Sequence, residues 1–333
     1  MLMMKVLLLG ATGLLGHNVL QQLAASGHHV VALVRNRHAL MLETPDTMVV
    51  EGSPTDQATL RQSASGCDAI VNCAGVTDMS LLHREDYMAV NATLCDNVVS
   101  TMEALGIRCL VHTSTANTIG YGSAGRPADE SAPMQEPFTK SYYAESKLTG
   151  EQTVLAAAGR HADWHAVVVN PGYMLGPMDV KPSSGRMLLA AYRRPLMFAP
   201  RGGKAFVDVR DVAAAVVSAL TRGANGSRYL AVNSHACLGI KELYQMQART
   251  IGYRQRVVTL PDWLLLAAGA VGDGLRRVGV RTELSTRNVR QLLVREYYDN
   301  RRAVGDLMMP ETDIEESIRH FHSWRHDHQT KNH

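Results

Sequence analysis

Short apolar runs alternate with longer segments of helical spacing through the first half of the chain. The apolar runs are rich in Val, Ile and Leu and are bounded by turn residues or helical segments, which is typical of buried strands. They cover residues 6–9, 30–34, 48–51, 69–72, 109–113 and 166–170. The segments between them predict helices over 14–25, 57–63, 87–105 and 142–157. This alternation predicts an α/β fold, in which helices cover both faces of a doubly wound parallel sheet.

Three glycines follow the first strand at once, in the spacing G-x-x-G-x-x-G. Gly10 permits a tight turn, Gly13 lets the backbone approach a pyrophosphate, and Gly16 lets the next helix pack closely on the strand. The helix that begins near Leu14 turns its unpaired N–H groups toward the phosphates. Strand, glycines and helix in this order predict a dinucleotide-binding Rossmann unit.

The sequence pattern changes after Asn170, where loops rich in Pro, Gly and Ser replace the alternation of predicted strands and helices. We therefore expect a Rossmann domain over residues 1–170 and a smaller C-terminal substrate-binding lobe over 171–333. Segments within about 205–235, namely 207–219 and 228–232, are expected to return to the Rossmann sheet. The apolar run 263–271 falls short of the ~20 residues that cross a bilayer, so it predicts a buried helix or a wall of the substrate pocket.

The charge after the second strand indicates which dinucleotide binds. An acidic residue at this point accepts hydrogen bonds from the ribose of NAD, whereas arginine pairs with the 2′-phosphate of NADP. The residues here are Arg35, Asn36 and Arg37, with no carboxylate among them. NADP is therefore favoured over NAD, and a solvated basic loop is the alternative.

Tyr143 and Lys147 are four residues apart in a predicted helix, so their side chains lie on one face. A tyrosine with its ordinary pKa near 10 is a poor acid–base catalyst at neutral pH. A neighbouring ammonium favours the phenolate, so we expect Lys147 to lower the pKa of Tyr143. Such pairs also arise by chance, and the nucleotide motif is what favours a catalytic pair here.

The chain resembles an extended short-chain dehydrogenase/reductase of the NAD-dependent epimerase/dehydratase family. The segment 72–75 (N-C-A-G) resembles the family's N-x-A-G, and residues 113–118 resemble its strand-five segment. The segments 170–177 and 206–213 resemble later family signatures, and 176–186 most resembles the dihydroflavonol-reductase-like branch. Relatives often have Gly-Asp after strand three, where this chain has Gly52 and Ser53, so Ser53 would have to serve in adenine recognition.

The resemblance implies an oxidoreductase in which Tyr143 donates a proton to a carbonyl while NADPH supplies hydride. Thr115 would orient the carbonyl oxygen, with Ser114 as the substitute, Lys147 would also hold the ribose, and Asn91 would serve site architecture and proton relay. The expected cofactor-binding residues are Gly10, Thr12, Gly13, Leu14, Leu15, Gly16, Arg35, Ser53, Cys73, Ala74, Gly75, Thr113, Tyr143, Lys147, Pro171, Gly172 and Met174.

Two other functions stay open. A nucleotide-sugar epimerase would use the same site for a transient oxidation, and Lys181, Arg186, Arg193 and Arg194 would then bind a pyrophosphate or simply form a solvated face. A non-catalytic NADP-sensing protein is the second alternative, although such proteins usually lack the Tyr/Lys pair. Sugar dehydratases carry Asp-Glu after the catalytic Thr, where this chain has Ala116 and Asn117, so dehydration is disfavoured.

The substrate cannot be read from the lobe. Its larger apolar side chains would line a pocket for a small hydrophobic compound or belong to the core: Tyr173, Met187, Tyr192, Met197, Phe198 and Trp263.

Composition and charge indicate which classes of binding partner are not expected. A net charge of +3 with scattered basic residues argues against nucleic acid. Five cysteines without a C-x-x-C pair indicate reduced thiols and a cytoplasmic protein, and no segment predicts a membrane span. His320, His322, His326 and His328 lack a metal-site signature, so no metal is expected. The family resemblance further implies a homodimer through helices 87–105 and 142–157, with Ala92, Val99 and Leu148 as contributors.

Overall fold

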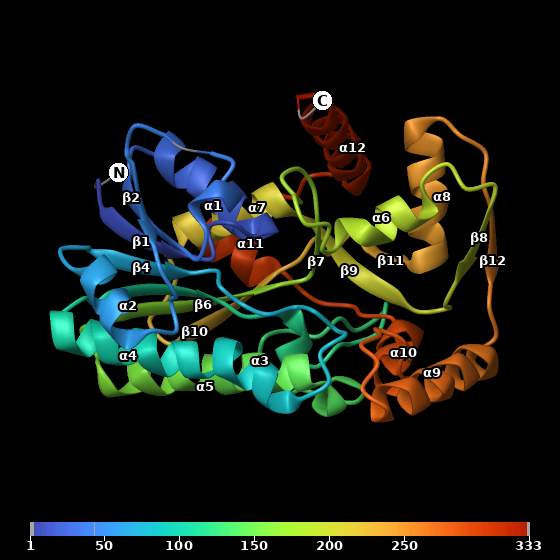
Figure 1. Cartoon of the computed structure of the whole chain (residues 1–333), viewed down its shortest axis with the longest axis horizontal. Coiled ribbons are helices and arrows are strands. Elements are labelled where there is room, and N and C mark those ends of the chain that lie inside the picture. The colour runs from blue at the N-terminus through green and yellow to red at the C-terminus, as the bar shows by residue number, and fades with distance from the viewer. Residues whose placement is uncertain (1–2, 43, 332–333) are drawn as a thin grey trace.

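A seven-stranded parallel sheet with helices on both faces forms the larger part of the molecule (Figure 1). The computed structural model describes residues 3–42 and 44–331. In spatial order the strands are β10 (Ser227–Ala231), β6 (His165–Pro171), β5 (Cys109–Thr113), β4 (Ala69–Asn72), β1 (Lys5–Leu9), β2 (His29–Val34) and β3 (Thr47–Glu51). Every neighbouring pair is parallel. The expected doubly wound α/β fold is thus confirmed, and its strand order reverses between β1 and β4.

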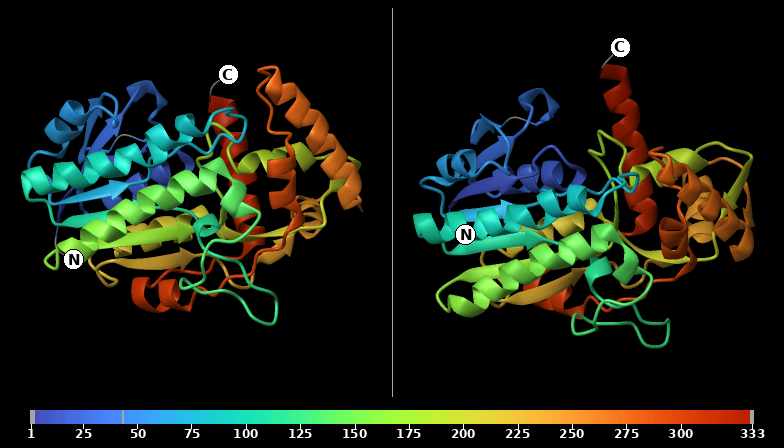
Figure 2. Two further views of the ribbon diagram at one scale, coloured as in Figure 1. Left: turned by 90° about the horizontal axis from the view of Figure 1, so that it is seen from below. Right: turned by 60° about the horizontal axis from the view of Figure 1, so that its bottom comes forward.

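The period of two along a strand divides the core into two layers. Val6 and Leu8 of β1 pack with the helices on one face, and Leu7 and Leu9 pack on the other. The first face is covered by α1 (Leu14–Ala25), α7 (Val209–Ser218) and α11 (Arg301–Leu307), and the second by α2 (Gln57–Ala64), α4 (Thr93–Leu105) and α5 (Tyr142–Arg160). Figure 2 shows α4 and α5 running side by side along the outer surface of the second layer.

The expected helix 87–105 is two helices, which corrects the sequence interpretation. α3 (Arg84–Asn91) ends where the side chain of Asn91 bonds to the loop after β4, and α4 starts anew at Thr93. Ala92 and Val99 are buried inside the subunit, so they cannot contribute to an outer interface as expected. Leu148 is half-buried.

The C-terminal lobe has its own small sheets and core. β7 (Tyr173–Leu175), β9 (Gly203–Asp208) and β11 (Cys237–Gly239) form one sheet, and β8 (Leu196–Ala199) pairs with β12 (Arg256–Thr259). The helices of the lobe are α6 (Gly185–Ala191), α8 (Ile240–Ile251), α9 (Asp262–Arg277), α10 (Thr286–Leu293) and α12 (Ile314–Lys331). Of the segments 207–219 and 228–232, the second supplies β10 to the large sheet, whereas the first supplies α7 and the end of the lobe strand β9.

A set of hydrogen bonds joins the segment around the start of α12 to the start of α7. The buried carboxylate of Asp211 accepts from the backbone N–H of Thr312 at 2.6 Å and from its hydroxyl at 2.7 Å. Ser317 of α12 donates to the buried carboxylate of Asp208 at 2.7 Å. Residues 312–317 thereby donate hydrogen bonds to the buried carboxylates of Asp208 and Asp211, which lie about 100 residues earlier in the chain.

No helix within the described residues combines the length and apolar character needed to span a bilayer. The apolar run 263–271 does form a helix, α9, but Trp263 and Val271 are largely exposed to solvent. The expectation of a buried helix is therefore wrong, while the alternative, a wall of the substrate pocket, stays a prediction.

Candidate active site

The residues expected to bind the cofactor gather at the carboxyl edge of the large sheet. Gly10 follows β1, residues 73–75 follow β4, Thr113 ends β5 and Pro171 ends β6. Gly10 has φ +81°, and a Cβ on it would lie 2.6 Å from the Ala74 nitrogen. Only glycine therefore lets the loops after β1 and β4 touch, at the point where the strand order reverses and ligands of open α/β sheets bind.

The N-terminus of α1 fits a pyrophosphate. Gly13 is its N-cap, and within the described residues no side chain caps the helix and no acidic residue stands in its first turn. The backbone N–H groups of Leu14, Leu15 and Gly16 have no acceptor among the described residues. Thr12 and Leu14 are half-buried, and Gly13 is exposed. Unpaired N–H groups at an accessible helix N-terminus form an anion site.

Arg35 is exposed just beyond β2, where a 2′-phosphate would lie. A carboxylate that the sequence analysis missed stands nearby. Glu51 ends β3, pairs in register with Val34, and accepts the backbone N–H of Arg37 at 3.2 Å. Ser53 is engaged with the hydroxyl of Thr55 at 2.8 Å. The register of β2 with β3 is what brings Glu51 here, and no local sequence pattern signals it.

Lys147 lies buried beneath this edge. Its Nζ donates to the Thr113 carbonyl at 2.6 Å, and the Thr113 hydroxyl donates to the Asn72 carbonyl at 2.7 Å. A Cβ on Gly75 would lie 3.4 Å from the Lys147 Nζ, so the backbone of Gly75 lies close against the buried ammonium. Burial lowers the pKa of Lys147.

Tyr143 lies on the same face of α5, one turn before Lys147. Burial raises the pKa of Tyr143, and the hydrogen bond with Thr115 opposes that rise. The expected lowering of this pKa by Lys147 is therefore wrong for the protein as it stands. The hydroxyl of Ser114, the substitute for Thr115, is buried without a hydrogen-bond partner among the described residues, so the contact with Tyr143 favours Thr115.

Asn91 braces the site. Its Oδ1 accepts the Val76 N–H at 2.8 Å, and its Nδ2 donates to the Val76 carbonyl at 3.1 Å and to the Ser146 hydroxyl at 3.0 Å. Ser146 in turn donates to the Tyr143 carbonyl at 2.8 Å. The side-chain amide is thus committed to holding the loop after β4 against α5, which is a positioning role.

A second brace was not foreseen from the sequence. The Asn170 Nδ2 donates to the Thr115 carbonyl at 3.2 Å and to the buried Glu151 carboxylate at 2.8 Å. Glu151 also accepts from Thr118 at 2.9 Å and from Arg228 at 3.0 Å. The available signal was Glu151 itself, since a carboxylate one turn after Lys147 on the buried face of a helix requires partners.

The loop after β6 closes the site toward the lobe. The Gly172 N–H donates to the Ala231 carbonyl at 3.1 Å, and a Cβ on Gly172 would lie 2.3 Å from the Ala205 carbonyl oxygen. Met174 is half-buried against the core under α1 and α7. Of the candidate pocket residues, Tyr173, Met187 and Met197 pack against the lobe core. The ring of Tyr192 lies against that of His322 at a tilt of 30°, and Phe198 and Trp263 are exposed.

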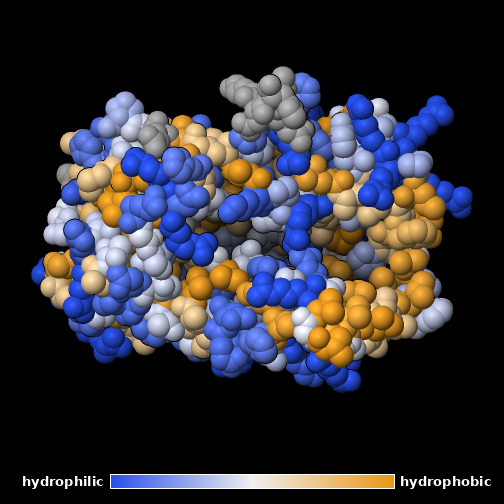
Figure 3. Space-filling model, in the orientation of Figure 1, coloured by the Kyte–Doolittle hydropathy of each residue, from blue (hydrophilic) through white to orange (hydrophobic). Residues whose placement is uncertain are grey.

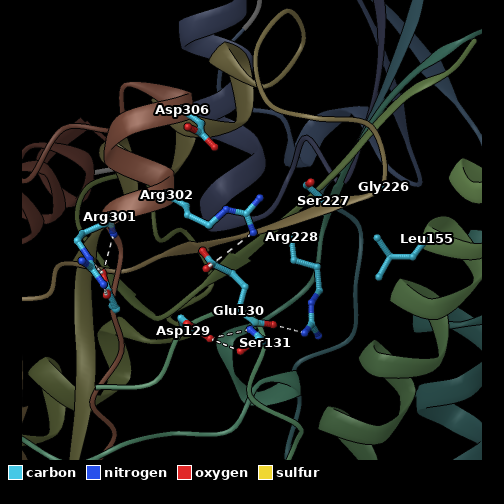
Figure 4. Close-up of a pocket in the computed structure, with 11 residues that line it drawn as sticks. Asp129, Glu130, Ser131, Leu155, Gly226, Ser227, Arg228, Arg301, Arg302 and Asp306 are labelled. Atoms are coloured by element: carbon cyan, nitrogen blue, oxygen red, sulfur yellow. Dashed lines mark hydrogen bonds and ion pairs between the residues drawn. The ribbon is translucent and has the colours of Figure 1, made fainter. Parts of the chain in front are cut away.

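A separate cavity of about 640 Å³ lies beside β10 (Figure 4), and neither Tyr143 nor Lys147 lines it. Its walls are charged, but Arg228 pairs with Glu151 and with the Glu130 carbonyl, and Glu130 accepts the Leu230 N–H at 3.0 Å. These groups seal the edge of the sheet. No cluster of three or more potential metal ligands occurs in the described part of the chain.

Comparison with known proteins places this geometry in a family. The profile of the NAD dependent epimerase/dehydratase family matches residues 6–233. A Synechocystis sp. protein that carries the provisional name dihydroflavonol 4-reductase is 30% identical over 329 residues, covering 96% of this chain and 94% of its own length. Sterol demethylase protein B of Methylococcus capsulatus is 29% identical over 280 residues, covering 82% of this chain and 83% of its own.

The fold is also similar to that of solved structures. UDP-glucose 4-epimerase of Thermotoga maritima, solved with UDP-glucose, superposes with a TM-score of 0.77 at 16% identity, covering 98% of this chain and all of its own. Family members use an NAD(P) dinucleotide, and the uncapped N-terminus of α1 fits its pyrophosphate. The chain belongs to the NAD dependent epimerase/dehydratase family and is an NAD(P)-dependent oxidoreductase.

Proposed function

We propose that the protein reduces the carbonyl group of a small hydrophobic compound with NADPH, or oxidises the corresponding alcohol. The observation that carries the proposal is the position of Tyr143 one turn before Lys147 on α5, with the Lys147 ammonium bonded to the Thr113 carbonyl at the end of β5. These groups occupy the edge of the sheet that also presents the α1 cradle. A proton donor and a dinucleotide site thus face the same cleft.

The bound dinucleotide would supply hydride to the carbonyl carbon. Tyr143 gives its proton to the carbonyl oxygen, and Thr115 holds that oxygen by a hydrogen bond. Because burial raises the pKa of Tyr143, the phenol stays protonated at neutral pH and serves as the acid for reduction. Lys147, fixed by the Thr113 carbonyl, would hold the nicotinamide ribose.

Arg35 supports NADP over NAD, because it offers an exposed guanidinium without a neighbouring acidic residue in the loop after β2. The names of the relatives support the substrate class. A dihydroflavonol and a sterol are both largely apolar ring compounds, so this chain is proposed to take a substrate of that character.

The test is a reductase screen with apolar ketones and aldehydes, followed by the loss of NADPH absorbance. Tyr143→Phe removes one hydroxyl, so turnover should fall by ~100-fold or more while NADPH binding is kept. Tyr142→Phe is the matched control, because the neighbouring ring stacks under Arg287 and faces away from Lys147 on the helix. Its turnover should stay close to that of the unmodified protein.

Two results would count against the proposal. Undiminished turnover in Tyr143→Phe would remove the tyrosine from the mechanism. Interconversion of sugar epimers without net consumption of NADPH would show an epimerase instead.

A further inference from the structure

The helix α9 carries its apolar residues on the outside of the molecule. Trp263 is 68% exposed, Val271 65%, Leu275 43% and Val278, just past the helix, 76%. At 3.6 residues per turn these positions fall within about 120° of the helix circumference, so they form one stripe. In Figure 3 this stripe contributes to an orange patch at the lower right, below and beside the hollow in the centre of the same face.

The inner face of α9 packs closely against the rest of the lobe. Gly272 and Gly269 are its buried residues, and their backbones lie directly against the segment that leads into α10. A Cβ on Gly272 would lie 2.0 Å from the Leu284 carbonyl oxygen. The helix therefore docks onto the lobe through glycines and leaves its large apolar side chains outward, the reverse of an ordinary amphipathic surface helix.

Exposed arginine side chains lie in the same segment of the chain as the apolar stripe. Residues 262–290 contain five arginines and three acidic residues, and Arg277, Arg281 and Arg290 are exposed. The acidic residues are engaged: Asp262 pairs with Arg201 at 3.0 Å, Glu283 with Arg186 at 2.5 Å, and Asp273 accepts the Thr286 N–H at 3.2 Å. An exposed apolar stripe flanked by arginines complements a surface that is apolar beneath and anionic above.

We propose that α9 docks this protein on the surface of a lipid bilayer that contains anionic headgroups. Trp263, Val271 and Val278 would lie among the headgroups and upper acyl chains, while Arg277 and Arg281 contact phosphates. A second copy of the chain fits less well, because Asp262, Asp273 and Glu283 are already engaged and leave no free carboxylate in this segment for the partner's exposed arginines. The proposal concerns attachment and does not depend on the proposed reaction.

The docked helix is also joined to the rim of the cleft. Arg276 donates to the Ser80 carbonyl at 3.2 Å and to the carbonyls of Met79 and Leu81, and Asn288 of α10 donates to Met79 at 3.1 Å. This segment follows the Cys73–Gly75 stretch at the end of β4. A lipid surface under α9 would therefore lie beside the opening of the site.

Flotation of the full-length protein with vesicles tests the proposal. We expect binding to phosphatidylcholine vesicles that contain phosphatidylglycerol, and markedly weaker binding to phosphatidylcholine alone or in high salt. Replacing Trp263 and Val271 together by Ser should lower the partition coefficient about tenfold or more, and Arg277→Glu should lower it on the anionic vesicles. Met48→Ser is the matched control, since Met48 is a 52% exposed apolar residue on β3 at the other end of the molecule.

The substituted side chains are exposed, so thermal unfolding of each variant should match the unmodified protein. Absence of binding to anionic vesicles, equal binding to neutral ones, or an equal loss with Met48→Ser would overturn the proposal. A dimer that dissociates in the Trp263/Val271 double variant would show that a second copy covers the stripe instead.

Discussion

Replacing Arg35 by Asp should reverse much of the preference for NADPH. Arg35 stands at the end of β2 with its side chain in solvent, and a 2′-phosphate placed there would face its guanidinium. The substitution exchanges an attractive charge for a repulsive one and leaves the buried strand β2 unchanged.

The size of the effect follows from the exposure of Arg35. In a water-like dielectric, two unit charges about 4 Å apart interact by roughly 1 kcal/mol, and a phosphate carries a charge near −2. Losing the arginine therefore costs about 2 kcal/mol, and the aspartate adds a comparable repulsion. Screening at physiological salt reduces both by about half, which leaves about 2 kcal/mol, or a ~30-fold rise in the Kd for NADPH.

The measurement is a fluorescence titration with NADPH and with NADH. NADH lacks the 2′-phosphate, so its Kd should change little in Arg35→Asp. Arg222→Asp is the control, because Arg222 is exposed after α7 at the opposite edge of the sheet. A Kd for NADPH that is unchanged in Arg35→Asp, or an unmodified protein that prefers NADH, would refute the assignment of Arg35.

Two further predictions concern the acid and the assembly. The pKa of Tyr143 is raised by burial, and reduction needs the protonated phenol, so kcat/KM for reduction should stay level through neutral pH and fall only in alkaline solution. Alcohol oxidation needs the phenolate and should rise over the same alkaline range; a fall in reduction between about pH 6 and 8 would contradict this assignment. We also propose a homodimer through the outer faces of α4 and α5, which run side by side along one surface. Light scattering should give twice the 36.4 kDa chain mass, and a monomer at micromolar concentration would exclude it.

The inner strands of the large sheet, such as β1, β4 and β5, were predictable because they are buried on both faces. Strands buried in this way appear in the sequence as continuous apolar runs, so 69–72 and 109–113 match β4 and β5 to the residue. The prediction of one helix over 87–105 failed because a tertiary contact ends the first helix. Asn91 must reach the loop after β4, and nothing in the local spacing shows that the helix stops there.

The prediction that α9 is buried failed because of how the helix contacts the lobe. Its apolar content is that of a buried helix, but its contact face consists of Gly269 and Gly272, and sequence alone does not tell which face meets the lobe. In the site, positions at strand ends could be predicted because motif spacing places them. The contacts of Glu151 with Asn170 and Arg228 could not, since they join residues 19 and 77 positions apart.

The bonds from residues 312–317 to Asp208 and Asp211 impose an order on biosynthesis. While the ribosome is still making residues 232–311, β10 can already take its place, but these two carboxylates have yet to receive the Thr312 and Ser317 donors. Asp208 is already paired with Arg210, but a nascent chain at this stage must keep α7 partly open or leave buried Asp211 without its donors. We therefore expect α7 to reach its final packing only after residues 312–317 have been synthesised, although its own sequence comes about 100 residues earlier.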